Sequence, residues 1–374
     1  MNWKKVECKG KQVWALLTEE GDLQVSKGLV PIRYSEAKDA KIYKASPYEK
    51  LLINSLNMLN YMVLSKSNGA KIEARRYDIN RNYLQEQGSE DGAVQAFGSY
   101  LAGLAFEQAN EPNKAIRFYG DAYQTVQSPE LEATIRALHH RTGATDPRLS
   151  KLLGAASTSS GSTGELIVIV QEGLVPRRVA ERLPLGAAVT RVTADPYYRY
   201  HMSAKEKAQA NRIAVKGLVT WVNYPQLKIH RERPPAITVS VDGKTHQPKL
   251  SLNLRNVVID YFKRSQGKVI AAAITRTLSR AIAGMATESL TQRSGGGPLA
   301  FLLGVAVQGT LTAADTPDTR GWVTLPARIH HLRLSLTEGV HTIKVRVGTR
   351  QYRKTVRIRE NQIKVINLSR HRAG

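Results

Sequence analysis

The chain has little cysteine and no apolar run long enough to cross a bilayer. Cys8 is the only cysteine among 374 residues, which excludes an intramolecular disulfide framework and a zinc site built from several thiolates. Glu7 and Lys9 flank it, and we expect an ordinary thiol. The apolar stretch within Pro298 to Thr312 runs for about fourteen residues, short of the roughly 20 that a spanning helix needs. It predicts a buried core helix, with a membrane-inserting segment as the alternative.

The sequence also lacks recognisable catalytic machinery. None of the motifs GxxxxGK(S/T), GxSxG and HExxH is present, and no GxGxxG follows a predicted strand. The adjacent pairs His139-His140 and His330-His331 point in divergent directions on a helix or a strand, which makes them poor metal chelates. Paired carboxylates in a recognisable setting, which a hydrolase of envelope polymers would need, are missing too. We therefore expect a protein that is not an enzyme, with no catalytic residue, no metal site and no cofactor.

Acidic residues are scarce relative to basic ones. The chain has 31 Asp and Glu against 55 Lys and Arg, a formal net charge of +24. Residues 1–164 carry a net charge of +3 and residues 165–374 a net charge of +21, so nearly all of the excess lies in the second half. Such a surface favours polyanions through counterion release and electrostatic steering. Nucleic acid, anionic lipid head groups and acidic envelope polymers all fit, because charge alone does not choose among them.

The stretch from Tyr100 to Pro129 has the spacing of two stacked, antiparallel helices. Small residues fall where tetratricopeptide-like helices approach closely, and aromatic residues fall where the groove between them is filled. The small residues are Gly103, Ala115 and Ala122, and the aromatic ones are Phe106 and Tyr119. Repeats of this kind usually present a surface to a protein partner. Tyr100 and Phe106 are therefore candidate residues for partner binding or domain docking.

Another helical hairpin is predicted before this one. Ser46 is a plausible N-cap, with Pro47 at the first helical position and Glu49 at the third. A second helix begins near Ala70, and a last helix, Pro129 to Arg141, caps the stack. The apolar stripes that favour these helices comprise Leu52, Leu56, Leu59 and Val63, and then Leu131, Ile135 and Leu138.

The whole chain is expected to be an α+β protein in four parts. These are a poorly defined N-terminal segment (1–45), a tetratricopeptide-like helical domain (46–142), a Ser/Gly-rich linker (143–164) and a basic domain of mixed helices and strands (165–374). In the basic domain Leu166 to Val170 reads as a buried strand. Separate helices are predicted at Leu252 to Lys263 and at Lys268 to Leu290, while RRVAERLPLG, residues 177–186, reads as a loop or short helix.

Alternation near the C-terminus predicts an antiparallel β-meander with one buried face and one basic face. Gly339 and Gly348 mark its turns, and Ile363 to Leu368 supplies its last strand. Tyr352 has the parity of the buried face, so no aromatic side chain is expected beside the cations for stacking on nucleic acid. The candidate polyanion-binding residues are Lys344, Arg346, Arg353, Arg357 and Arg359.

Two charged motifs are further candidates for docking. In EARR, Glu73 can pair with Arg76 on a helix as part of a solvated face, or Arg75 and Arg76 can anchor the helices to the second domain or to an acidic ligand. In ADTPDTRGWVTLP, residues 314–326, an acidic side chain can pair with an isolated arginine while a tryptophan covers the edge of the core. A structural clamp and a ligand site both fit that second motif, whose candidate residues are Asp318, Arg320 and Trp322.

These motifs resemble those of a known family. The blocks YEKLLINSLNMLNYMVLSKSNGAKIEARRYD, ELIVIVQEG and ADTPDTRGWVTLP, in this order around the repeat hairpin, resemble a poorly characterised family of bacterial envelope lipoproteins. The resemblance implies a periplasmic or outer-membrane-associated protein that joins tetratricopeptide-like helices to a basic, strand-rich domain and is not an enzyme. The chain departs from the family before residue 46, where no export signal or lipid-bearing cysteine is evident. The matching motif positions are Glu73, Arg75 and Arg76, and Asp318, Thr319, Arg320 and Trp322.

We therefore expect a non-catalytic scaffold or adaptor of the cell envelope. Its helical repeats would bind a protein or peptide, and its basic domain would bind an anionic envelope polymer or lipid head groups, without a transmembrane span. The alternative is a cytoplasmic nucleic-acid-binding protein that uses the same basic sheet.

Overall fold

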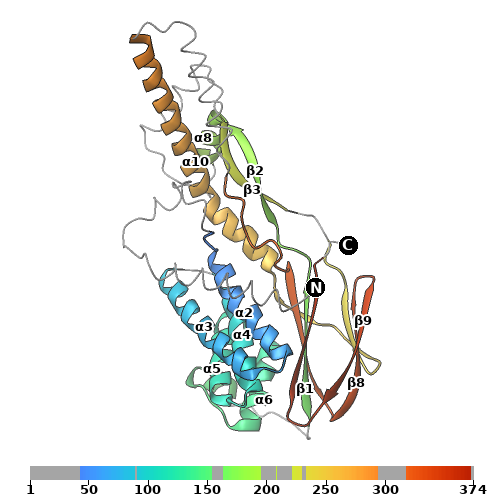
Figure 1. Ribbon diagram of the computed structural model, residues 1–374. Helices are drawn as coiled ribbons and strands as arrows, with labels where there is room; N and C mark the ends of the chain where they lie inside the picture. Colours follow the sequence, from blue (N-terminus) through green and yellow to red (C-terminus); the bar gives the residue numbers. More distant parts are fainter. Residues whose placement is uncertain are drawn as a thin grey trace.

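In the computed structural model, helices pack beside two stacked β-sheets, and a hairpin and a long helix extend away from them (Figure 1). The predicted α+β class and the N-terminal helical hairpins are confirmed. The structure describes residues 43–88, 91–153, 163–194, 208, 221–229, 233–293 and 317–371. Cys8 and the apolar stretch 298–312 lie outside these residues.

The helical bundle comprises α2 (Pro47–Val63), α3 (Ser67–Glu86), α4 (Gly92–Gln108), α5 (Pro112–Thr125) and α6 (Pro129–Thr142). The predicted start of the first helix is confirmed, because the Ser46 backbone N–H donates to the Glu49 carboxylate at 2.7 Å. The last helix of the bundle, α6, is capped at its C-terminus by Gly143, whose φ of +69° lies in the left-handed region that favours glycine.

The predicted close approach of α4 and α5 depends on Gly103. A Cβ atom at this position would lie 2.5 Å from Cδ1 of Tyr119, whose side chain is fully buried. The same arrangement recurs between α3 and α4, where a Cβ atom on Gly98 would lie 2.2 Å from Cε2 of Tyr77. In both pairs the tyrosine ring occupies the space that a side chain on the facing helix would need, which fixes the spacing of the helices.

Replacing Gly103 by alanine should lower the free energy of unfolding by about 1–3 kcal/mol, because the added methyl group overlaps a ring that has no free space to move into. Urea unfolding monitored by circular dichroism measures this change. Gly120→Ala in α5 is the matched control, since its Cβ would come no closer than 3.2 Å to its nearest neighbours, namely the ends of the Arg148 and Asp146 side chains. A Gly103→Ala variant as stable as Gly120→Ala would contradict the prediction.

The first sheet has the strand order β10 (Ile363–Arg370), β1 (Gly164–Glu172), β7 (Arg328–Leu336), β6 (Lys249–Leu252). All nine residues of β1 are buried, which confirms the strand predicted from its apolar run. One face, with Ile167 and Ile169, shares a core with the helices, and the other face packs against the second sheet. The protein therefore has three layers, with this sheet in the middle.

The second sheet has the order β5 (Lys244–His246), β4 (Ile237–Val241), β8 (Gly339–Val347), β9 (Arg350–Ile358). Strands β8 and β9 pair antiparallel around Gly348, as predicted. The predicted last strand of the meander is wrong in its pairing, because β10 leaves this sheet and pairs in parallel with β1 in the middle layer. Alternation along β10 fixes which residues face the core but not which strand it joins.

An arm extends from the layered body (Figure 1). It contains the hairpin of β2 (Arg177–Pro184) and β3 (Trp221–Lys228), the helix α8 (Leu185–Ala194) and the long helix α10 (Leu254–Arg293). Two predictions are wrong here, because RRVAERLP forms a strand and the two expected helices are one continuous helix. The cost of Gly267 inside α10 is offset by packing, since Ile270 and Ile274 are fully buried against the hairpin and α8. None of the described helices has the length and apolar character needed to span a membrane.

The expected boundary at residues 143–164 separates two segments of the chain but not two cores. A short 3₁₀ helix, η3 (Pro147–Leu149), and α7 (Ser150–Leu153) occupy part of it, and Leu149 and Leu152 are buried. One apolar cluster joins residues of the bundle to residues of β1, β10 and α10. The bundle is therefore stabilised by the sheet on which it packs.

Candidate polyanion-binding face and the junction of helices and sheets

The outer face of the second sheet gathers four of the five predicted polyanion-binding residues. Lys344 of β8 lies directly opposite Arg353 of β9, and Arg346 and Arg357 follow at the same parity. All four side chains are exposed, because this face points away from the middle layer. The alternate residues of β8, such as Ile343 and Val345, are buried between the sheets. We call Lys344, Arg346, Arg353 and Arg357 the basic face. 

The basic face has no acidic neighbour within its own sheet. The strands β4, β5, β8 and β9 contain no Asp or Glu. The acid in the β4–β5 turn, Asp242, is occupied, because its carboxylate lies 2.6 Å from Nδ1 of His341 and accepts the backbone N–H of Thr342 at 2.8 Å. These hydrogen bonds lower the pKa of Asp242. The ion pairs formed among the described residues involve none of the four cations.

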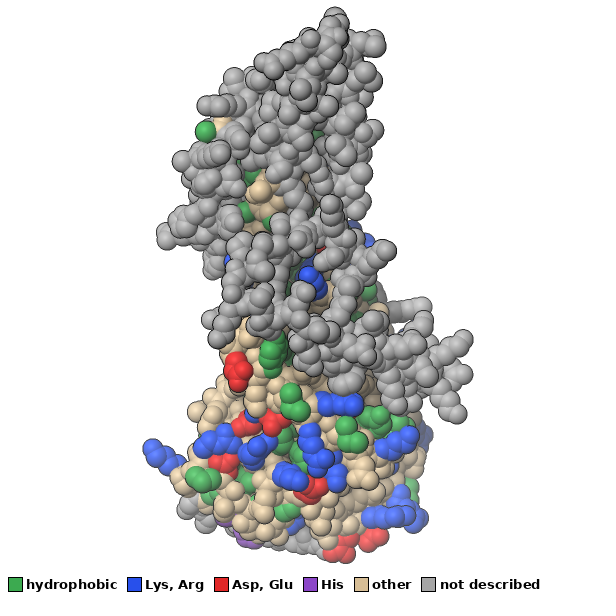
Figure 2. All heavy atoms as spheres, turned by 60° about the vertical axis from the view of Figure 1, so that its left-hand side comes forward, with side chains coloured by type: hydrophobic (Ala, Val, Ile, Leu, Met, Phe, Trp, Pro, Cys, Tyr) green, Lys and Arg blue, Asp and Glu red, His purple; other side chains and the backbone are tan. Residues whose placement is uncertain are grey.

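The surface on the helical side is different. The view in Figure 2 shows Lys and Arg side chains interleaved there with Asp and Glu side chains over the body of the molecule. A groove lined by α3, α5 and η3 illustrates this alternation of charge. In it, Arg81 pairs with Asp121 at 2.6 Å and Arg117 pairs with Asp78 at 2.8 Å. Among the described residues, positive charge is thus unbalanced on the outer face of this sheet, whereas on the helical side basic side chains pair with acidic ones.

The remaining residues of the predicted meander lie at the margin of the basic face. Arg359 is exposed just after β9, in the turn toward β10. Tyr352 lies opposite Val345, at the parity of the inner face as predicted, but its side chain is 36% exposed. Tyr352 lies on an edge strand whose first six residues are all exposed, so parity alone does not bury this ring.

The EARR motif stabilises the bundle from within. Glu73 is buried, accepts a hydrogen bond from Asn54 of α2 at 2.9 Å and pairs with Arg76 at 2.8 Å. Arg75 is exposed on the outer side of α3, near Ile79, whose side chain is 69% exposed. The predicted pair of Glu73 with Arg76 is confirmed, and both arginines reach solvent, since Arg75 is exposed and the Arg76 side chain is 41% exposed.

The two aromatic candidates on α4 have different surroundings. Phe106 is buried inside the hairpin, where it stacks on Phe118 with ring centroids 5.4 Å apart. Tyr100 lies against the middle sheet, with its ring centroid 5.3 Å from that of His331 in β7. Burial lowers the pKa of His331 to about 4, so the imidazole is neutral at physiological pH. Tyr100 thus contacts the sheet, whereas Phe106 has no exposed surface to offer a partner.

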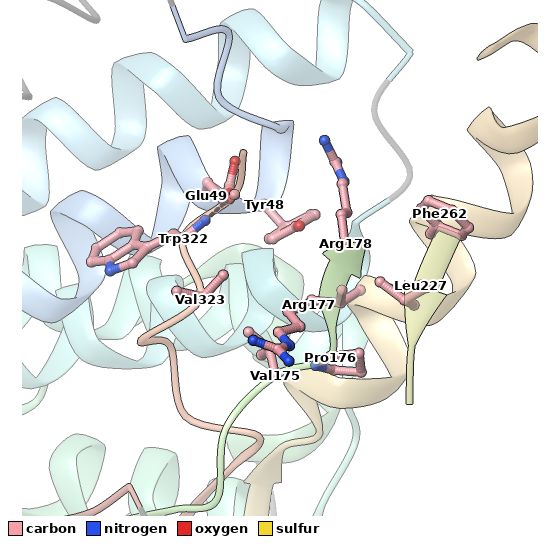
Figure 3. Close-up of a pocket in the computed structure, with 12 residues that line it drawn as sticks. Tyr48, Glu49, Val175, Pro176, Arg177, Arg178, Leu227, Phe262, Trp322 and Val323 are labelled. Atoms are coloured by element: carbon pink, nitrogen blue, oxygen red, sulfur yellow. Dashed lines mark hydrogen bonds between the residues drawn. The ribbon is translucent and has the colours of Figure 1, made fainter. Parts of the chain in front are cut away.

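The described part of the motif ADTPDTRGWVTLP, residues 317–326, contacts both the arm and the start of the bundle. The predicted pairing of Asp318 with Arg320 is confirmed, with Oδ1 and Nε 2.9 Å apart. The Trp322 backbone N–H donates to Glu49 at 2.8 Å, and the Glu49 side chain lies against this backbone in Figure 3. Arg178 of β2 donates to the Arg320 carbonyl at 3.2 Å. This segment therefore ties the first turn of α2 to the hairpin of the arm.

A buried charge cluster at the same interface was not predicted. Arg333 of β7 binds Glu107 of α4, with Nη2 and Oε1 2.7 Å apart, and also pairs with Glu165 of β1. Arg141 of α6 binds the same Glu107 oxygen at 2.5 Å, and the Tyr119 hydroxyl donates to Glu107 at 2.6 Å. The two carboxylates and two guanidinium groups neutralise one another, and they lock the bundle onto the sheet.

Among the residues that the structure describes, no group of three or more His, Cys, Asp or Glu side chains could hold a metal ion. The cavity in Figure 3 lies between α2, the arm and the Trp322 segment, and its Glu49 carboxylate is already hydrogen-bonded on both oxygens. Compared with known proteins, the chain matches no family model, no curated protein and no solved structure.

Proposed function

We propose that the protein is a non-catalytic adaptor that binds a linear polyanion on its basic face. The observation that carries this proposal is the exposed set Lys344, Arg346, Arg353 and Arg357 on a sheet whose strands contain no acidic residue. Residues two apart on one strand are separated by about 6–7 Å, and neighbouring strands by about 5 Å. A linear anion can therefore contact several cations at once, releasing its condensed counterions.

The helices supply the second half of the proposed adaptor. The outer side of α3 presents Arg75 together with the exposed apolar side chains Ile72 and Ile79, a combination that suits a protein or peptide partner. By its resemblance to envelope lipoproteins, we place the protein in the periplasm or at the outer membrane, where the polyanion would be an acidic envelope polymer or lipid head groups. 

Reversing three charges of the basic face should weaken binding and reduce its salt dependence. For Lys344→Glu, Arg353→Glu and Arg357→Glu combined, the slope of log K against log salt should fall in magnitude by about 3, because each lost contact removes about one unit. The measurement is a titration of fluorescent polyphosphate at several salt concentrations. The matched control reverses Lys151, Arg182 and Lys263, three exposed cations outside this sheet, and so has the same net charge. An unchanged slope in the first variant would overturn the proposal.

The exposure of Tyr352 favours a second candidate function, binding of single-stranded nucleic acid. In that case Tyr352→Ala should weaken binding of a single-stranded oligonucleotide about fivefold or more, the loss of about one stacked base, and leave polyphosphate binding unchanged. If Tyr352→Ala weakens the binding of neither ligand, the basic face is a site for polyanions that involves no stacking.

A further inference from the structure

Strand β9 is an edge strand that is exposed on both of its faces. It pairs with β8 on one side, and no other described strand pairs with its outer side. Seven of its nine residues are exposed, and only Val356 and Ile358 are buried. Figure 1 shows β9 at the outer margin of the second sheet. Its first six residues thus form a strand that is open at its edge and on both faces.

The hairpin geometry determines which backbone groups point outward. Val347 pairs with Arg350 across a two-residue turn at Gly348, so these two residues exchange hydrogen bonds. Pairing then alternates, which directs the N–H and C=O groups of Gln351, Arg353, Thr355 and Arg357 away from β8. The opposite side of β8 shows the same alternation. Thr342, which lies opposite Thr355, directs its carbonyl away from β9 and toward β4, where it accepts the Asp242 backbone N–H at 3.0 Å.

The charges of β9 decide what can pair with this edge. Arg353 and Arg357 lie on the basic face, and Arg350 and Lys354 lie at the opposite parity. A second copy of β9 aligned alongside would bring these cations next to one another, which is how natural proteins keep edge strands from self-association. An acidic strand would instead meet a cation on each face, so the edge that repels its own copy attracts an anionic one.

We propose that β9 binds an extended acidic peptide by adding it to the sheet as a further strand. Main-chain hydrogen bonds to the outward-facing groups would provide the pairing, and acidic side chains at alternate positions would lie beside Arg353 and Arg357. The inference goes beyond the proposed polyanion function: it shares two cations with it but requires, in addition, the hydrogen-bonding edge. The ligand class is a polypeptide with acidic residues in alternation, and not a polymer without amide groups.

The test uses an alternating Glu-Val peptide and two N-methylated isomers, with the full-length chain and fluorescence anisotropy. Each isomer carries methyl groups on one alternate set of amides, so both keep the charge and side chains of the parent. Paired on an edge, one set faces β9 and the other faces solvent. We expect one isomer to bind about tenfold or more weakly than the parent and the other to bind like the parent, because the first loses several hydrogen bonds. Equal affinity of the two isomers would overturn the inference.

A variant of the chain separates this inference from the proposed function. Thr355→Pro removes an outward N–H of β9 and leaves every charge in place, and proline is tolerated on edge strands where the N–H faces solvent. Peptide binding should fall about tenfold while polyphosphate binding is retained. If the variant loses both peptide and polyphosphate binding while circular dichroism shows an intact fold, the edge model is contradicted. If the wild-type chain binds the peptide but not polyphosphate, only the proposed polyanion function is contradicted.

Discussion

Replacing Arg333 by methionine should lower the free energy of unfolding by about 3 kcal/mol. The guanidinium group lies between Glu107 and Glu165, and the Glu107 side chain is only 2% exposed. Removing one partner of a buried ion pair leaves a buried charge without compensation, which costs about 3–5 kcal/mol. We expect the lower end of this range, because Arg141 stays in contact with Glu107 and its side chain is 39% exposed. Urea unfolding at neutral pH measures the change.

The loss should depend on pH in a defined direction. Burial by itself would raise the pKa of Glu107, but the charge of Arg333 and the hydrogen bonds from Arg333 and Tyr119 outweigh burial and hold the pKa below its ordinary value of 4.5. A lowered folded-state pKa gives stability that is present above the unfolded-state value and lost as pH falls through the folded-state one. The difference between wild type and Arg333→Met should therefore be largest near neutral pH and shrink below about pH 4.5.

The control for this experiment is Arg136→Met. Arg136 pairs with Glu132 at 3.8 Å on the surface of α6, where both side chains are about one third exposed. A surface pair of this kind contributes at most about 1 kcal/mol. If Arg333→Met were no more destabilising than Arg136→Met, or if its effect did not change with pH, the cluster would not be what holds the bundle on the sheet.

The sequence predicted correctly the features that depend on residues close to one another along the chain. Gly103 indicated the crossing of two helices, Glu49 a helix start, and the alternation around Ile343 a strand with one buried face. The unbroken apolar run of β1 also indicated burial on both faces. These features depend on local geometry, so a single sequence records them.

Features that depend on which elements meet were missed. In β7 the leucines on either side of Arg333 pack toward the second sheet, and alternation would place Arg333 in solvent. That face is instead covered by the bundle, as Ile329 and Ile167 on the same side indicate. The partner of β10 was missed for the same reason. Alternation distinguishes inside from outside, but it does not say whether the outside is covered by a further layer.

Replacing Glu49 by leucine should release the junction between α2 and the Trp322 segment and lower the free energy of unfolding by about 2–4 kcal/mol. The Glu49 carboxylate accepts the Tyr43 hydroxyl at 2.5 Å, the Ser46 backbone N–H at 2.7 Å and the Trp322 backbone N–H at 2.8 Å. Leucine has a similar size but no acceptor, so these donors lose their partner together. Trypsin should then cut more rapidly after Arg320, because this segment is no longer fixed to the helix.

The matched control for the junction is Glu132→Leu. Glu132 is also an acidic residue in the first turn of a helix that begins with proline, and it also accepts a tyrosine hydroxyl, that of Tyr123, at 2.7 Å. It joins no distant segment, so its loss should cost less than about 1 kcal/mol and leave cleavage after Arg320 unchanged. Faster cleavage in Glu49→Leu alone would assign the effect to the junction. Destabilisation without faster cleavage would mean that Glu49 acts only as a helix cap, and that other contacts hold the Trp322 segment in place.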